Sequence, residues 1–278
     1  MAVTPGDVKK LRDATGAGML DCKNALVKAE GDFAAAQKIL KEQGLAAAGQ
    51  RSGRAADNGL VFTAVTEGRA VMVHLTCETD FVARNAVFRS AGEKIAAAVI
   101  ASGGTEKTDE LETLVKEAGA VLKENMQLGR IVCWDIAENE AVVNYAHNGG
   151  SIGVLVKLGC ESAEAAAGES VRTLAFDLAL HAAAYNPVYL NRDAVDPDYL
   201  NEQREIFTAQ ANRIGGKPEK VIQGIAQGKL NKHLSQICFE DQGFVKDDKK
   251  PVKQVIAEFS KAAGSGVKLL DYAYIAAG

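Results

Sequence analysis

Apolar residues recur every three to four positions over the first part of the chain, a period that indicates helices rather than strands. Glycines interrupt this period at Gly16 and Gly31, where a helix commonly ends. The pattern predicts short helices at residues 5–15, 19–29 and 33–43. Helices of this length bury barely enough surface for independent stability, so we expect them to form one small bundle.

The helical period is lost over residues 50–59, which we interpret as a linker. Apolar runs at residues 60–66 and 70–76 follow, joined by the short segment Glu67-Gly68-Arg69. A connection of this length with a glycine is typical of a β-hairpin. Further along, the pattern predicts helices at 86–100 and 111–124 and strands at 131–137 and 141–147.

The central part of the chain contains a repeat with an offset of 83 residues. The apolar run 71–75 ends in Thr76-Cys77-Glu78-Thr79, and the run 154–158 ends in Gly159-Cys160-Glu161-Ser162. A helix is predicted after each copy, the second at residues 169–184. Both copies therefore predict the same strand, turn and helix.

An insertion of helical character separates the second copy from the C-terminal residues. Leu200, Phe207 and Ile214 lie seven positions apart, and Gly215-Gly216-Lys217-Pro218 precedes a further helix at 219–230. Glycine after one helix and proline at the start of the next are typical of a tight helical hairpin. The remaining residues predict strands at 237–239 and 272–275 around a helix at 252–263.

These elements predict an α+β fold, with an N-terminal three-helix domain and two repeated helix-on-antiparallel-sheet subdomains that carry an inserted helical hairpin. We assign the parts as follows: three-helix domain 1–49, linker 50–59, core subdomain N 60–140, core subdomain C 141–185 with 231–278, and antiparallel hairpin 186–230.

Composition indicates a soluble, ordered protein, with 47% hydrophobic and 24% charged residues. The net charge of -4 argues against a direct nucleic-acid binder, which needs a concentrated basic surface. No apolar run approaches the roughly 20 residues that span a bilayer, so we predict no membrane insertion. Five scattered cysteines form no zinc motif or disulfide framework, and we expect a reducing, cytoplasmic location.

Sequence patterns do not predict an enzyme. The four histidines, His74, His147, His181 and His233, have no recognisable nucleophile or carboxylate partner. Neither a Gly-rich phosphate loop nor a dinucleotide fingerprint is present. We therefore predict no cofactor, no metal and no bound nucleotide.

The repeat itself singles out a candidate site. Asp80 and Phe81 in the first copy are replaced by Ala163 and Glu164 in the second, so the shared scaffold does not require them. Two interpretations remain open. In the first, Phe81 is a core aromatic and Asp80 caps the following helix. In the second, Asp80 and Phe81 both contact a partner.

Three stretches resemble one known family. They are Thr76-Cys77-Glu78-Thr79-Asp80-Phe81-Val82-Ala83, the run from Val8 to Leu26 followed by Gly31-Asp32, and Tyr145-Ala146-His147 leading into Ile152 to Val156. Their order and spacing are similar to those of the elongation factor Ts family, the guanine nucleotide exchange factors of bacterial and organellar translation. The first stretch resembles the family's signature segment.

The resemblance implies release of GDP from elongation factor Tu, with Thr79, Asp80, Phe81 and Val82 placed beside the partner's Mg²⁺ site. It also implies that His147 contacts the partner near its phosphate-binding side. The three-helix domain then resembles a ubiquitin-associated domain.

Around the Gly16-Ala17-Gly18 loop, the resemblance implies partner contacts for Leu11, Met19 and Leu20. Core packing is the alternative interpretation for Leu20. Some members of the family dimerise through the helical hairpin, so a homodimer is possible here.

One departure and one alternative function limit the comparison. Where some relatives have a glycine before Glu124-Asn125, this chain has Lys123, which puts the neighbouring contact in doubt. The alternative to an exchange factor is a non-catalytic adaptor between proteins, which needs surface patches but no Asp-Phe pair.

Overall fold

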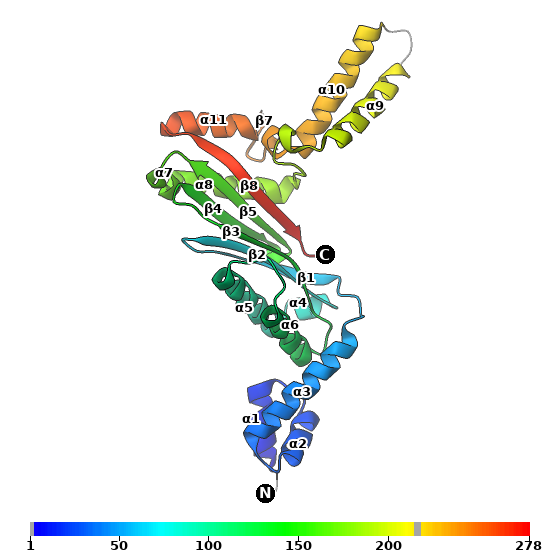
Figure 1. Ribbon diagram of the computed structural model, residues 1–278, viewed down its shortest axis with the longest axis vertical. Coiled ribbons are helices and arrows are strands. Elements are labelled where there is room, and N and C mark those ends of the chain that lie inside the picture. Colours follow the sequence, from blue (N-terminus) through cyan, green and yellow to red (C-terminus); the bar gives the residue numbers. More distant parts are fainter. Residues whose placement is uncertain (1–2, 214–217) are drawn as a thin grey trace. The chain divides into compact units, whose positions relative to one another are not determined.

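The computed structural model describes residues 3–213 and 218–278, without the side chains of residues 45–50 (Figure 1). The chain forms two compact units. The first consists of Met1–Asp135, Ala146–Gly153 and Ile275–Gly278, and the second of Ile136–Tyr145 and Val154–Tyr274. The N-terminal helices thus belong with the first sheet, and the helical hairpin belongs with the second half of the chain.

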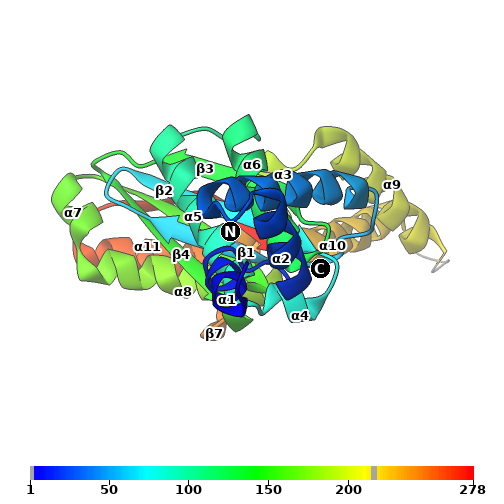
Figure 2. The ribbon, with the colours of Figure 1, turned by 90° about the horizontal axis from the view of Figure 1, so that it is seen from below.

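The N-terminal helices form a small bundle (Figure 2), built from α1 (Pro5–Thr15), α2 (Met19–Lys28) and α3 (Phe33–Arg51). Thr4 caps α1, because its hydroxyl accepts the Asp7 N–H while the Asp7 carboxylate accepts the Thr4 N–H. Gly16, at φ 69°, ends the helix. The bundle core consists of Val8, Leu11, Cys22, Ala25, Leu26 and Ala36.

Helix α3 is longer than the 33–43 predicted from its apolar period, and only residues 52–57 lie between it and the next strand. The alanines at 46–48 explain the difference, since alanine extends a helix without any apolar face. Gly44 lets α3 approach helix α6 (Asp109–Leu122), because a Cβ there would lie 2.9 Å from the Ala120 Cβ. The linker predicted at 50–59 is therefore too long at both ends, because α3 continues to Arg51 and the next strand begins at Asn58.

The first sheet has the order β1–β2–β3, with both pairs antiparallel. Its strands are β1 (Asn58–Val65), β2 (Arg69–Cys77) and β3 (Gln127–Asp135), and α5 (Ala86–Ser102) and α6 (Asp109–Leu122) pack against it. Val71, Val73 and Leu75 of β2 form a core with Phe88 and Ile95 of α5. Strand β3 begins four residues before the predicted 131 because Gln127 pairs with Thr76.

The second sheet has the order β4–β5–β8, with strands β4 (Glu140–His147), β5 (Ile152–Cys160) and β8 (Val267–Ala276). The other elements here are α7 (Ala163–Ala167), α8 (Glu169–Tyr185), β6 (Gly243–Phe244), β7 (Asp247–Pro251) and α11 (Val252–Ala263).

The strand predicted at 237–239 was wrong. Ile237 ends a helix, and Phe239–Asp241 form one 3-10 turn.

The repeat is confirmed in detail. β5 and α8 begin and end at positions shifted by 83 residues from those of β2 and α5. Position by position, β2 and β5 also have the same pattern of buried and half-buried residues. One strand-and-helix scaffold is therefore used twice, as the α+β prediction required.

The inserted hairpin consists of α9 (Pro197–Asn212) and α10 (Glu219–Ile237), which pack against each other. Buried residues of α10 recur every four positions, at Ile222, Ala226, Leu230 and Leu234. This buried stripe continues beyond the predicted end of the helix at 230. Of the predicted turn Gly215-Gly216-Lys217-Pro218, the first three residues lie outside the described part of the chain, as does Ile214, while Pro218 directly precedes α10.

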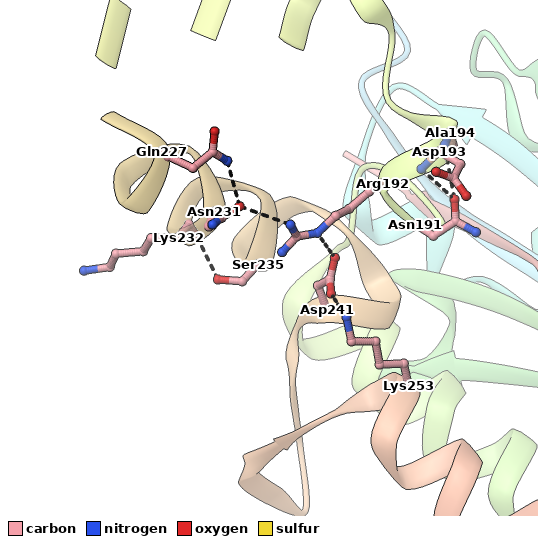
Figure 3. Close-up of polar contacts among 10 residues, drawn as sticks. All are labelled: Asn191, Arg192, Asp193, Ala194, Gln227, Asn231, Lys232, Ser235, Asp241 and Lys253. Carbon is pink, nitrogen blue, oxygen red and sulfur yellow. Dashed lines mark hydrogen bonds and ion pairs between the residues drawn. The ribbon is translucent and has the colours of Figure 1, made fainter. Parts of the chain in front are cut away.

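Within the second unit, a buried carboxylate ties the base of the hairpin to α11 (Figure 3). The Asp241 side chain, 7% exposed, accepts hydrogen bonds from Arg192 Nε at 2.6 Å and from Lys253 Nζ at 2.5 Å. Arg192 also donates to Asn231 of α10 at 3.1 Å. Burial alone would raise the pKa of Asp241, but the hydrogen bonds and charges of Lys253 and Arg192 outweigh it and lower the pKa.

We expect Asp241→Ala to lower the free energy of unfolding by about 2 kcal/mol, because hydrogen bonds to charged groups are lost. Since the folded-state pKa is depressed, this contribution is present above the ordinary aspartate pKa of about 4 and is lost as pH falls below it. Urea unfolding across that pH range measures both effects. Asp248→Ala, at an exposed position in β7, is the control and should change stability by less than about 0.5 kcal/mol.

Candidate functional site

The turn that follows β2 carries the candidate residues. Thr79 caps the four-residue helix α4 (Asp80–Ala83), because its hydroxyl accepts the Val82 N–H at 3.3 Å. Asp80 is therefore the first residue of the helix and not its cap, which corrects one interpretation of the sequence. In the second copy Ser162 caps α7 in the same way, through the Ala165 N–H at 3.2 Å.

Phe81 projects from this turn and is 82% exposed, more than any other large apolar side chain in the described part of the chain. The interpretation of Phe81 as a core aromatic is therefore wrong. Asp80 is also exposed and forms an ion pair with Arg84 at 3.0 Å. Val82 packs partly against the sheet core, and Ala83 is buried. Thr79 and Val82 thus fix the turn, while Asp80 and Phe81 face solvent.

Glu124, which follows α6, accepts three hydrogen bonds from the turn. Its Oε2 accepts the N–H groups of Glu78 at 3.0 Å and of Thr79 at 3.1 Å. Its Oε1 accepts the Thr79 hydroxyl at 2.6 Å. Hydrogen bonds to a charged acceptor are stronger than neutral ones, so this carboxylate firmly links α6 to the turn.

Asn125 and Glu78 complete the link. The Asn125 N–H donates to Glu78 Oε1 at 2.6 Å, and its side-chain amide donates to the Arg54 carbonyl, also at 2.6 Å. Asn58 of β1 donates to the Glu78 carbonyl at 2.9 Å. Sequence patterns predict none of these contacts, because the partners lie far apart along the chain. The adjacent Glu124 and Asn125 just after a helix are the only local signal.

Lys123 ends α6 with φ at 60°, the left-handed region that glycine adopts most easily. A glycine would adopt this backbone conformation with less strain. Lys123 Nζ also lies 3.5 Å from the Asp21 carboxylate of α2. Lys123 thus ends the helix and also forms an exposed ion pair.

Cys77 lies fully buried under the turn, and its thiol donates to the Thr79 carbonyl at 3.2 Å. Burial, together with the negative charge of Glu124, raises its pKa to about 11. The thiol is therefore protonated near neutral pH and acts as a packing group.

His147 is exposed at the end of β4, immediately before the 3-10 turn η1 (Asn148–Gly150). It belongs to the same compact unit as α4. Gly150, at φ 107°, lets η1 approach β1, since a Cβ there would lie 3.0 Å from the Val61 carbonyl oxygen. The close packing of η1 against β1 fixes the backbone that follows His147.

The N-terminal candidates divide into two groups. Met19 is 48% exposed and Leu20 is 69% exposed at the start of α2, so core packing is excluded for Leu20. Leu11, in contrast, is fully buried in the bundle core. A direct partner contact by Leu11 does not fit this structure, because its side chain has no accessible surface. The amphipathic period of α1 directs Leu11 inward.

Within the described residues, no group of three or more His, Cys, Asp or Glu side chains is arranged to hold a metal ion. The described helices include none that is both long enough and apolar enough to span a membrane. The candidate site is an exposed aromatic and acidic pair on a hydrogen-bonded turn.

Comparisons with known proteins agree on one family. The sequence model of the family described as Elongation factor TS matches residues 78–278. The Elongation factor Ts of Borrelia hermsii is 44% identical over 279 aligned residues, covering 100% of both chains. That of Borreliella burgdorferi is 43% identical over 277 residues, covering 99% of both. That of Treponema denticola is 41% identical over 269 residues, covering 97% of this chain and 96% of the relative.

Because Phe81 makes few contacts within the chain, we expect Phe81→Ala to change the free energy of unfolding by less than about 0.5 kcal/mol. Phe88→Ala, seven residues later, is the matched contrast. Phe88 is fully buried, so its removal should cost about 3–5 kcal/mol. Urea unfolding of both variants tests this difference, and a large loss for Phe81→Ala would mean that the ring packs within the protein.

Proposed function

Because the chain belongs to the elongation factor Ts family, whose role lies in translation elongation, we propose that it is the guanine nucleotide exchange factor for elongation factor Tu. It binds the GDP-bound partner, disrupts the partner's Mg²⁺ and phosphate contacts, and promotes GDP release so that GTP can bind. The chain itself catalyses no chemical step in this proposal.

The exposure of Phe81 on an anchored turn is the observation that carries this proposal. Water-exposed phenylalanine is unfavourable, and burying it in a partner stabilises the complex by roughly 1.5–3 kcal/mol. The second copy of the scaffold has Glu164 at this position and still forms the same succession of strand, short helix and long helix. Folding therefore does not explain the aromatic ring at this place, whereas contact with a partner does.

The proposed mechanism follows from how GDP is held. In a translational GTPase, backbone N–H groups and Mg²⁺ hold the phosphates of GDP. A factor speeds release only if it binds better to the state in which those contacts are broken. Phe81 acts as a rigid wedge that displaces a partner element, while Asp80 competes with, or repels, the groups ordered around the ion.

Thermodynamic linkage makes this effect reciprocal. If the factor weakens nucleotide binding, nucleotide weakens binding of the factor by the same ratio. Rebinding of GTP therefore releases the factor, and the cycle can continue.

The remaining candidates provide affinity in this proposal. Met19 and Leu20 offer an exposed apolar pair at the start of α2, and His147 offers a polar contact from the same compact unit. Central apolar anchors usually contribute most of the binding energy of an interface. Leu11 contributes indirectly, because it holds α1 against α2.

A non-catalytic adaptor is the second candidate function. Exposed apolar residues on α2, and Ile206 and Val221 on the hairpin helices, are compatible with simple protein binding. A homodimer through α9 and α10 likewise stays a prediction. An adaptor would tolerate loss of Asp80 and Phe81 with at most a change in affinity.

We expect the double variant Asp80→Ala, Phe81→Ala to lower the saturating rate of GDP release by roughly 30-fold or more, since about 2 kcal/mol of wedge energy is lost. Release of a fluorescent GDP analogue from elongation factor Tu measures this rate, with complex formation followed in parallel. The control is Glu164→Ala, which alters the equivalent position of the second copy and should leave release unchanged. Fast release by the double variant would mean that exchange does not depend on the Asp80–Phe81 wedge, and no acceleration by the native chain despite binding would favour the adaptor.

Leu20→Ala tests the affinity contribution separately. We expect the concentration for half-maximal release to rise roughly tenfold, with little change in the saturating rate, because Leu20 contacts the partner away from the nucleotide. The same release assay, run over a range of factor concentrations, separates the two quantities. A fall in the saturating rate alone would place Leu20 among the residues that act on the nucleotide site.

A further inference from the structure

Helix α4, which presents Phe81, is too short to be stable by itself. A helix of four residues gains few internal hydrogen bonds and relies on its surroundings. The Thr79 cap supplies one contact, and the Glu124 carboxylate supplies three more, to the Glu78 N–H, the Thr79 N–H and the Thr79 hydroxyl. Glu124 is thus the principal polar contact that fixes the direction of α4.

The second copy of the scaffold shows that folding alone does not require this carboxylate. There α11 precedes β8, the neighbour of β5 in its sheet, as α6 precedes β3, and the connection between them, Gly264-Ser265-Gly266, contains no carboxylate. Ser162 still caps α7 through the Ala165 N–H. The carboxylate therefore accompanies the copy that carries Phe81, and it is missing from the copy that carries Glu164.

We propose that Glu124 is a positioning residue for nucleotide exchange: it holds the Thr79 turn rigid so that Phe81 enters the partner without a further ordering cost. This inference rests on the exchange function proposed above. An exposed aromatic on a loose turn would lose part of its binding energy to ordering, whereas a preorganised one would not.

The neighbours of Glu124 extend the same role. Lys123 reaches Asp21 of α2, two residues after Met19, and Asn125 reaches the Arg54 carbonyl beyond α3. Three consecutive residues thus contact the helix that carries Met19 and Leu20, the turn that carries Phe81, and the segment between them. This segment, Lys123 to Asn125, keeps the proposed contact surfaces in a fixed relation within one compact unit.

Two substitutions of Glu124 separate positioning from charge. Glu124→Ala removes all three acceptor contacts. Glu124→Gln keeps an oxygen that accepts both backbone N–H groups, and its amide N–H can donate to the Thr79 hydroxyl oxygen. The glutamine variant should therefore preserve the turn without the negative charge. Glu110→Ala, at an exposed position in the first turn of α6, is the matched control.

The test combines hydrogen exchange of the free protein with GDP release from elongation factor Tu. For Glu124→Ala we expect amide exchange at Glu78 and Thr79 to accelerate at least roughly tenfold, while the sheet and α6 stay protected. The saturating rate of GDP release should fall by roughly tenfold or more, with a smaller change in the half-saturating concentration. Glu124→Gln should restore both readouts, and Glu110→Ala should alter neither.

Several results would overturn the inference. Unchanged amide exchange in Glu124→Ala would mean that the carboxylate does not hold the turn, and unchanged release despite a loosened turn would mean that rigidity is not needed. Loss of protection throughout α6 and the sheet would mark Glu124 as merely structural. If the native chain fails to speed release at all, the exchange function fails, and the amide measurement still decides whether Glu124 positions the turn.

Discussion

A strand that ends inside a packed unit leaves backbone N–H groups without strand partners, and these groups need acceptors. Strand β2 lies at the centre of the first sheet and is fully buried from Ala70 to Val73. Where it ends, Glu124 accepts the N–H groups of Glu78 and Thr79. This one carboxylate lets the chain leave the sheet in a defined direction, and the exposed position of Phe81 depends on that direction.

The duplicated scaffold explains how an exposed aromatic is compatible with folding. Both copies bury the same strand positions and the same alanine of the short helix, Ala83 or Ala166. The first two residues of each short helix, at positions 80 and 81 and at positions 163 and 164, are exposed. Their side chains therefore contribute little to the stability of the fold. The first copy has Asp80 and Phe81 there, and the second has Ala163 and Glu164, so the two positions are free to serve a partner in one copy alone.

The buried polar residues of the described part of the chain, Asn125, His181 and Gln242, lie in or against connecting segments, and each is hydrogen-bonded. Asn125 joins the end of α6 to the segment after α3. In the second unit His181 accepts the Val245 N–H at 3.1 Å through Nδ1, so its Nε2 donates to Gln242 at 3.0 Å. Burial lowers the pKa of His181, which favours the neutral ring. The ring is also stacked on Phe239. Such contacts fix the loops that the apolar core cannot hold.

The sequence by itself determined the α+β class, the helices α1 and α11 to the residue, and the repeat, because these depend on local periodicity and on residue types at fixed spacing. It also singled out Asp80 and Phe81, since one copy could be compared with the other. Only the tertiary structure decided that Phe81 is exposed, that Leu11 is buried, and that Glu124 holds the Thr79 turn. The physical reason is that exposure and hydrogen-bond partners depend on residues far apart in the chain, here 45 positions between Thr79 and Glu124.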